Sequence, residues 1–277
     1  MKRLTQEMPA TKSQDHIIDN GMSVVMTLAV VIGVVYVLAQ TDSGFLYVLS
    51  NGLPPFLAFA AFATATAGLI HNGVNMKSRV SSVWVGYTLG VLFWFLGEFT
   101  WAVYALWYSI PDPFPSVADV FWLVGYAPLI CAIAVQSWPF RGFLTSRRMV
   151  PVILAVFALA GLALVVLIPQ TYLSAIGQDF GTVFFSLAYP LLDVALLVIA
   201  LPVLFLFGKG TFWRPFLFVT VGLILTFLGD ILFSWTTLNG TYYDGSYLEL
   251  FFHGSYLALA YGFYLRFKGG SGSKMLG

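Results

Sequence analysis

The sequence is poor in charged residues and carries a single cysteine. Only 9% of its 277 residues are charged, whereas soluble domains carry about 25%. The 13 Lys and Arg are balanced by 12 Asp and Glu, so neither a polybasic nucleic-acid binder nor an acidic tail is indicated. One cysteine, Cys131, excludes an intrachain disulfide and a cysteine-based metal site. We expect Cys131 to pack as a small hydrophobe.

Long apolar runs fill most of the chain instead. Hydrophobic residues make up 59% of the sequence and the mean hydropathy is +0.87, which is typical of an integral membrane protein. No stretch alternates polar and apolar residues as a membrane β-strand would. The sequence therefore predicts an all-α integral membrane protein with eight transmembrane helices of sufficient length. Their expected ranges are about 20–40, 53–71, 81–109, 116–138, 149–168, 182–207, 213–237 and 247–267.

The basic residues predict the orientation of these spans. The connections around Asp42, Asp112, Asp179 and Asp244 contain no Lys or Arg. Short loops that carry Lys and Arg stay on the cytoplasmic side, so we expect a plasma-membrane protein with both termini in the cytoplasm. An even number of spans, and the lack of a lysine inside any of them, argue against a seven-helix retinal protein. All basic residues fall in the termini or the alternate connections: Lys2, Arg3, Lys12, Lys77, Arg79, Arg141, Arg147, Arg148, Lys209, Arg214, Arg266, Lys268 and Lys274.

The third and fourth predicted spans resemble the seventh and eighth, which indicates an internal duplication. The run TLGVLFWFLGE, which ends at Glu98, matches TVGLILTFLGD, which ends at Asp230, and the two helix starts PSVAD and GSYLE follow in nearly the same register. We expect two halves, about 20–138 and 149–267, related by an axis along the membrane normal. The predicted organisation is a cytoplasmic segment 1–19, a membrane domain 20–268, and a Gly/Ser tail or linker remnant 269–277.

Four polar residues inside the spans are candidates for function. Charged side chains within a span cost about 2.5–3.5 kcal/mol on insertion scales and usually face a cavity or the bundle interior. Glu98, Asp193, Asp230 and His253 all fall in the outer halves of their spans. Helical spacing places aromatic residues on the same faces. We therefore predict an aromatic-walled, ligand-binding pocket open to the exterior, formed by Trp94, Glu98, Trp101, Tyr189, Asp193, Asp230, His253 and Tyr256.

These residues also have structural interpretations. Glu98 and Asp230 could be buried acids that hold neighbouring helices together by hydrogen bonds. Asp193 follows Pro190 and could satisfy a kinked backbone, and His253 could be a satisfied buried histidine. The sequence offers no phosphate-binding loop and no metal-ligand or serine-hydrolase motif. We expect no metal and no cofactor.

Two further acids fit helix caps. Asp119 and Glu249 each come three residues after a serine, Ser116 and Ser246, that opens a predicted helix. This is the spacing of a capping box, in which the serine and the acid bond each other's backbone N–H groups. The sequence therefore predicts a capping role for both acids.

The motifs carry a resemblance to a known class of module. The runs GEFTWAVY, PFPSVADVFWLVGY, AYPLLDVALL, LGDILFS and GSYLELFFHGSY, spread over residues 82–267, resemble the multi-span N-terminal membrane modules of prokaryotic signalling proteins. In such proteins the module precedes a diguanylate cyclase or histidine kinase domain. The resemblance implies sensing by the membrane module. This chain carries no catalytic output domain after Lys268, so we expect either a truncated chain or a module that acts through a partner.

The leading hypothesis is therefore a sensor or receptor module. It would bind a small apolar or amphiphilic ligand in the exterior-facing pocket, with membrane lipid around it and a cytoplasmic signalling partner. The alternative is an intramembrane lipid hydrolase in which Glu98 and Asp230 serve as acid and base. The run LGD before Ile231 is similar to lysoplasmalogenase-type hydrolases, in which paired intramembrane aspartates are central. The duplication by itself also allows a small-molecule transporter.

Overall fold

All of the regular structure in the described residues is helical. The structure is a computed structural model that describes residues 10–111, 113–140, 142, 146–147, 149–206 and 214–269. Two short elements, the π-helix η1 (Val103–Trp107) and the 3-10 helix η2 (Trp138–Phe140), accompany the long helices. The long helices are α1 (Ala10–Ala39), α2 (Ser43–Asn72), α3 (Arg79–Ala102), α4 (Val117–Ser137), α6 (Val150–Ala175), α7 (Phe180–Leu206), α8 (Arg214–Leu238) and α9 (Glu249–Lys268).

These eight helices overlap the eight predicted ranges, although α1 and α2 each begin about ten residues earlier than predicted. Six of them are long and apolar enough to cross a membrane: α1, α2, α3 with η1, α4, α7 and α8. The apolar part found in α6, Val150–Leu162, is shorter, so the number of eight spans stays a prediction. α1 begins at Ala10, so part of the expected polar N-terminal segment is helical. Residues before 10 and after 269 lie outside the described chain, as do Asp112, Arg141, Arg148 and Lys209.

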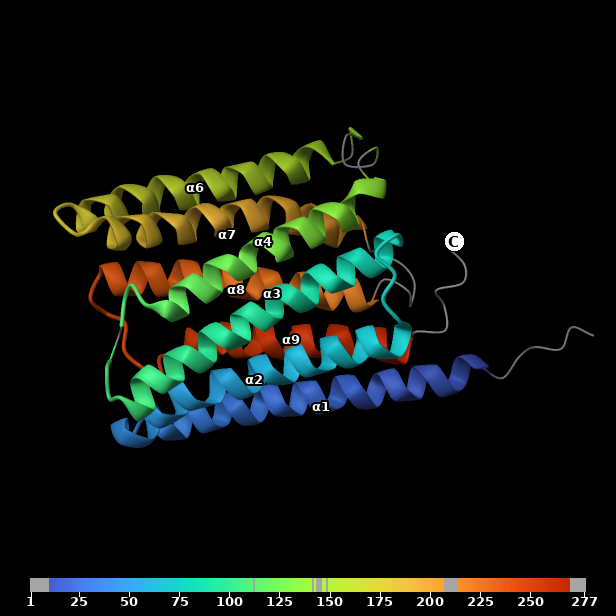
Figure 1. Cartoon of the computed structure of the whole chain (residues 1–277), viewed down its shortest axis with the longest axis horizontal. Helices are drawn as coiled ribbons and strands as arrows, with labels where there is room; N and C mark the ends of the chain where they lie inside the picture. The colour runs from blue at the N-terminus through green and yellow to red at the C-terminus, as the bar shows by residue number, and fades with distance from the viewer. Residues whose placement is uncertain are drawn as a thin grey trace, which may run out of the picture.

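The helices form one bundle in which each runs antiparallel to the next (Figure 1). α1 begins and α9 ends at the same end of the bundle, where the connections with Lys77 and Arg147 also lie. We call this the basic end. The opposite end holds the connections with Asp42, Asp179 and Asp244, and we call it the acidic end. The charge pattern of the sequence therefore sorts onto the two ends of the fold.

Helix α9 lies in the interior of the bundle. It packs against α2, α8 and α1, and eleven of its residues are buried. A helix surrounded by protein can carry polar side chains that a lipid-facing helix cannot, which explains why α9 is the least apolar of the eight. The outer helices instead expose large apolar side chains, such as Phe56 of α2 and Val165 of α6, each more than 70% exposed.

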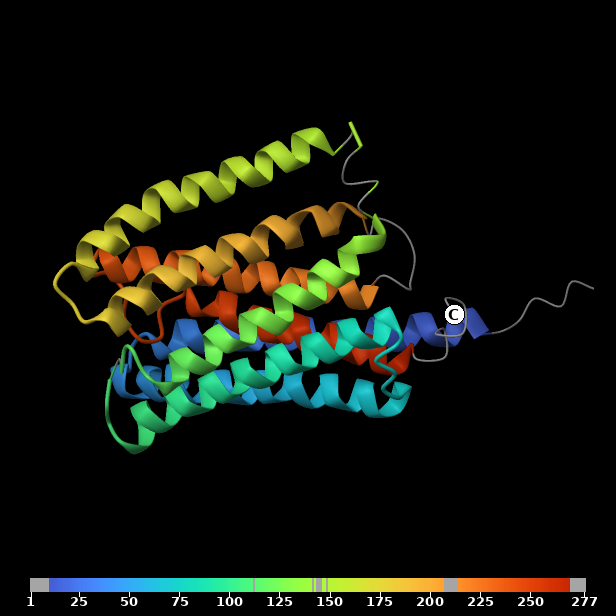
Figure 2. The same cartoon turned by 45° about the horizontal axis from the view of Figure 1, so that its top comes forward.

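Glycines bring α3 onto α4 and α8 onto α9, which lie side by side in both views (Figure 2). A Cβ atom on Gly90 would overlap the Leu129 side chain, and one on Gly222 would lie 2.7 Å from Leu259 Cγ. Small residues at a helix interface allow the backbones to approach closely. The same pair of contacts repeats two turns further on, with Gly97 against Trp122 and Gly229 against Phe252. When the two matching motifs are aligned, Gly90 corresponds to Gly222 and Gly97 corresponds to Gly229. Leu129 and Trp122 correspond in the same way to Leu259 and Phe252.

Acids in the connections at the acidic end cap helices. The Asp42 carboxylate accepts hydrogen bonds from the backbone N–H groups of Gly44 and Phe45 at 3.0 Å. Asp179 accepts from the Thr182 hydroxyl at 2.7 Å and from its backbone N–H. These bonds lower the pKa of the Asp179 carboxyl, because they favour its charged form.

Cys131 does not pack in the core. It lies on an exposed face of α4, so the prediction of a packed small hydrophobe was wrong. α4 is apolar on all sides, and its sequence pattern therefore does not distinguish the face toward protein from the face toward lipid.

Candidate functional site

Five carboxyl groups of the bundle each accept a hydrogen bond from a tyrosine hydroxyl. No Lys or Arg occurs between Val80 and Phe140, nor between Pro215 and Leu265, so hydroxyl donors take the place of basic partners on α3, α4, α8 and α9. Buried acids need such donors because an unpaired polar group in a low-dielectric interior is costly. We call this set the acid–tyrosine network. Its pairs are Glu98 with Tyr256, Asp119 with Tyr189, Asp193 and Asp230 with Tyr126, and Glu249 with Tyr36 and Tyr242.

The acids of the duplicated motif are bonded crosswise. Tyr256 of α9 donates to Glu98 Oε1 of α3 at 2.7 Å. Tyr126 of α4 donates toward Asp230 Oδ2 of α8 at 3.1 Å. Tyr126 and Tyr256 occupy matching places in the two motifs, as do Glu98 and Asp230. The acid of each predicted half therefore takes its tyrosine from the other half.

Asp193 and Asp230 form a carboxyl pair beneath Tyr126. The Tyr126 hydroxyl lies 2.5 Å from Asp193 Oδ1 and 3.1 Å from Asp230 Oδ2. The hydroxyl has one proton to donate, and ionised carboxylates only accept hydrogen bonds. The Trp94 ring meets Tyr126 edge to face, with centroids 5.6 Å apart. The two carboxyl groups therefore compete for one hydroxyl proton in a largely apolar enclosure.

Glu249 and His253 form a second cluster with α1 and α2. Tyr36 donates to Glu249 Oε2 at 2.9 Å and Ser50 donates to Oε1 at 2.8 Å. His253 Nδ1 donates to the Glu249 carbonyl at 2.6 Å, which leaves Nε2 facing the Tyr36 hydroxyl at 3.2 Å. His253 is 2% exposed, and both of its ring nitrogens have a polar neighbour. The Tyr36 proton goes to Glu249, so Tyr36 does not also donate to Nε2.

The two predicted capping boxes differ in outcome. The box of Ser116 and Asp119 is confirmed: Ser116 N–H donates to Asp119 Oδ2 at 2.7 Å and Ala118 N–H donates to Ser116 Oγ at 3.2 Å. The box predicted for Glu249 was wrong, because α9 begins at Glu249 itself and its N-cap makes no side-chain bond. The Glu249 carboxylate accepts hydrogen bonds from Tyr36 and other donors instead.

The remaining predicted residues lie next to the network. Tyr189 shares a face of α7 with Asp193, and its hydroxyl donates to Asp119 Oδ1 at 2.9 Å. Trp101 Nε1 donates to Asn51 Oδ1 of α2 at 2.9 Å, so it ties α3 to α2. The residues that sequence reasoning missed are Tyr36, Ser50, Asn51, Trp122, Tyr126 and Tyr242. Of these, Tyr126 had a visible signal, since it aligns with Tyr256 in the duplicated motif.

An apolar groove of about 430 Å³ runs over the seam between α2 and α3. It lies toward the acidic end, because it follows the first half of α2 and the last turns of α3 with η1. Phe56 and Trp107, which line it, are more than 70% exposed, so the groove opens on the outer surface of the bundle. None of the predicted site residues lines it. Its walls are Gly52, Pro55, Phe56, Phe59, Phe95, Phe99, Ala102, Val103, Leu106 and Trp107.

Comparison of the chain with protein-family models, with curated proteins and with solved structures finds no match. Among the described residues, no group of three or more His, Cys, Asp or Glu side chains is placed to hold a metal ion. The chemistry available at this site is therefore that of buried carboxyls, tyrosine hydroxyls, one imidazole and an adjacent apolar groove.

Proposed function

We propose that this protein is an integral membrane sensor or receptor module. In this proposal all eight helices span the plasma membrane, with the basic end in the cytoplasm, and the two halves arose by duplication. The concentration of Lys and Arg at one end of the bundle supports the orientation. The matched glycine contacts of α3 with α4 and of α8 with α9 support the duplication. The ligand would be small and apolar or amphiphilic, and the signal would pass to a cytoplasmic partner.

The main support for the proposal is that the apolar groove lies beside polar contacts that join α2 to α3 and to α9. Ala102 lines the groove, and the preceding residue along the chain, Trp101, donates to Asn51 of α2. Ser50, next to Asn51, donates to Glu249. Ligand sites in helix bundles are mostly apolar with a few polar groups close by. A ligand wedged between α2 and α3 would move the residues that hold the acid–tyrosine network.

The groove is bordered by backbone that can rearrange. η1 is a π-helix, an element that is common at functional sites, and the Tyr47 hydroxyl of α2 donates to its Ala105 carbonyl at 3.1 Å. α2 contains Pro54 and Pro55, which remove backbone donors and weaken the helix locally. A change from π-helix to α-helix is a discrete step of the kind that a switch requires.

Contacts between α2 and α9 connect the two ends of the bundle. At the acidic end Ser50 donates to Glu249. At the basic end Gly68 lies against Phe263 and Arg266, and Asn72 Nδ2 approaches the Arg266 carbonyl at 3.4 Å. A shift of α2 beside the groove would therefore reach the end of α9 on the proposed cytoplasmic side.

To test this proposal, a larger side chain is placed in the groove and ligand binding is measured. A Cβ on Gly52 would meet Leu106 at an ordinary 3.7 Å, so Gly52→Leu places its side chain in the groove without a clash at Cβ. Trp107 lines the groove and is 81% exposed, so a dibrominated fatty acid bound there would quench its fluorescence. We expect saturable quenching in the unmodified protein and in Val165→Leu on α6, and its loss in Gly52→Leu and Trp107→Phe.

Equal saturable quenching in Gly52→Leu and in the unmodified protein would contradict a ligand site in the groove. Native mass spectrometry of the purified protein provides a second measurement, because a retained small molecule should be lost selectively in Gly52→Leu.

A lipid hydrolase is the second candidate, and one observation favours it. Glu98 and Asp230 each accept a hydrogen bond from a tyrosine of the opposite half, and an acid and a base acting on one bond would be two such carboxyl groups. Glu98→Gln and Asp230→Asn keep the side-chain shape and remove the charge. Hydrolysis of a lysophospholipid that both variants abolish would support an enzyme, whereas no hydrolysis by the unmodified protein would exclude it.

A further inference from the structure

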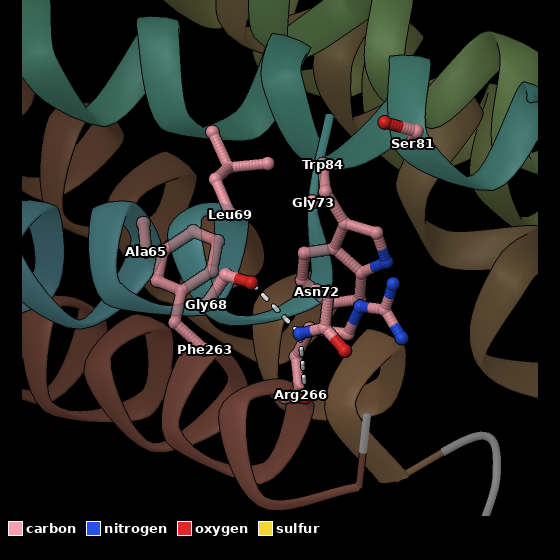
Figure 3. Close-up of a pocket in the computed structure, with 9 residues that line it drawn as sticks. All are labelled: Ala65, Gly68, Leu69, Asn72, Gly73, Ser81, Trp84, Phe263 and Arg266. Atoms are coloured by element: carbon pink, nitrogen blue, oxygen red, sulfur yellow. Dashed lines mark hydrogen bonds between the residues drawn. The ribbon is translucent and has the colours of Figure 1, made fainter. Parts of the chain in front are cut away.

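A small cavity at the basic end, far from the acid–tyrosine network, contains unpaired donors. It has a volume of about 10 Å³ and lies between α2, α3 and α9 (Figure 3). Such a volume admits about one water-sized group. The side chains whose chemistry matters here are Asn72 of α2, Ser81 and Trp84 of α3, and Arg266 of α9.

Trp84 has a buried donor that lacks a partner. The residue is 3% exposed, and its Nε1 atom has no hydrogen-bond partner in the described part of the chain. Buried N–H groups without a partner are rare and costly. Figure 3 shows the indole nitrogen of Trp84 turned to the same side as the Arg266 guanidinium. A molecule that accepts a hydrogen bond at this point would satisfy the indole.

Arg266 has a partly buried charge without a counter-ion. Its guanidinium carbon lies 5.7 Å from the centroid of the Trp84 ring, and within the described residues no carboxylate pairs with it. The closest acid in the sequence is Glu249, more than four helical turns away at the start of α9. A cation that is partly removed from water without an anion beside it favours the binding of one.

Ser81 and Asn72 complete the polar lining. Ser81 Oγ accepts a hydrogen bond from the Asn75 N–H at 2.9 Å, so its own hydroxyl proton remains available to donate. Asn72 Nδ2 is held by the Gly68 carbonyl at 2.7 Å, while Asn72 Oδ1 has no partner. Asn72 Oδ1 is an acceptor and therefore does not contribute to anion binding.

We propose that this cavity binds an oxyanion of the phosphate type, with Arg266 supplying the charge and the Trp84 N–H and Ser81 hydroxyl donating to one inserted oxygen. The cavity accepts one oxygen, and the rest of the anion lies at its mouth beside the guanidinium. Arginine forks match phosphate geometry particularly well. The anion is either the phosphate of a phospholipid headgroup or a free phosphate from solution.

The experiment uses ¹⁹F NMR of the full chain labelled with 5-fluorotryptophan in phosphate-free maltoside detergent. Trp84→Phe identifies the Trp84 resonance by its absence. Short-chain phosphatidylglycerol and inorganic phosphate are titrated separately. We expect a saturable shift of the Trp84 resonance with at least one of them. A response to the lipid alone assigns the site to a headgroup, and a response to inorganic phosphate assigns it to a soluble anion.

Two variants of α9 make the test specific. Arg266→Gln removes the charge and should weaken binding about tenfold or more, the effect expected for loss of a charged hydrogen bond. Lys268→Gln removes an exposed basic residue two positions away that does not line the cavity, and should leave the affinity within about twofold. If Arg266→Gln does not fold, Ser81→Ala should weaken binding without removing a charge.

The proposal is overturned if neither probe gives a saturable shift of the Trp84 resonance, which would leave the cavity to a water molecule. It is equally overturned if the shift survives unchanged in Arg266→Gln. Because the groove at the acidic end plays no part in this experiment, its outcome is independent of the sensor proposal.

Discussion

The Tyr126 hydroxyl lies 3.1 Å from an Asp230 carboxylate oxygen, and the matching tyrosine of the other motif, Tyr256, lies 2.7 Å from Glu98. Each bond joins helices from opposite halves of the chain. Hydrogen bonds between helices within a membrane contribute to bundle stability because lipid offers no competing partner. The crossed pair therefore ties the first four helices to the last four at the level of the acids.

Loss of these tyrosine hydroxyls should destabilise the bundle. Tyr126→Phe removes a donor shared by Asp193 and Asp230, so we expect a loss of about 1–3 kcal/mol. Tyr256→Phe removes the donor to Glu98 alone and should cost less. The measurement is the unfolding midpoint in detergent. Tyr264→Phe is the control, because Tyr264 makes ring contacts only; a Tyr126→Phe midpoint equal to that of the control would contradict the network.

The carboxyl pair predicts a protonated aspartate. Infrared spectroscopy of the purified protein should show a carboxylic acid C=O band that is absent in both Asp193→Asn and Asp230→Asn, because either amide supplies the missing donor to the remaining carboxylate. For the same reason each substitution should change the stability by less than about 1 kcal/mol. Glu98→Gln is the control and should retain the band. Persistence of the band in both aspartate variants would show that the proton resides elsewhere.

The glycines at corresponding places of the two matching motifs, Gly90 and Gly222, should tolerate substitution poorly. Gly222→Ala places a Cβ atom 2.7 Å from Leu259 Cγ, and such overpacking costs about 1–3 kcal/mol. Gly90→Ala should be destabilising for the same reason, because its Cβ atom would overlap the Leu129 side chain. The matched control is Gly161→Ala in α6, where nothing lies within 4 Å and alanine should stabilise the helix by about 0.5–1 kcal/mol. Parallel losses in Gly222→Ala and Gly161→Ala would indicate that the packing is not responsible.

The proposed orientation is tested by labelling of single cysteines on intact cells. Cys131 is exposed and is first replaced by alanine. Gln178→Cys, in the exposed connection at the acidic end, should react with a membrane-impermeant maleimide, whereas Lys77→Cys, at the basic end, should react only after permeabilisation. The reverse pattern would place the acidic end in the cytoplasm and refute the orientation.

The sequence by itself determined the helical segments and several of their ends. Apolar runs of sufficient length have one favourable structure in lipid, because only a helix satisfies every backbone group internally. Local sequence motifs also predicted local structure correctly, as for the capping box of Ser116 and Asp119. The matching sequence runs that end at Glu98 and at Asp230 were visible too, because they keep the same spacing along the chain.

Only the tertiary structure decided which faces meet and which partners each acid takes. An apolar helix in a bundle looks alike toward lipid and toward protein, so its pattern did not reveal that Cys131 is exposed. Two partners of Glu249, Tyr36 and Ser50, come from α1 and α2, some 200 residues away, and no local spacing encodes them. The groove and the Arg266 cavity likewise arise where separate helices converge. Helix formation depends on near neighbours in the chain, whereas burial and hydrogen bonding between helices depend on how the whole bundle packs.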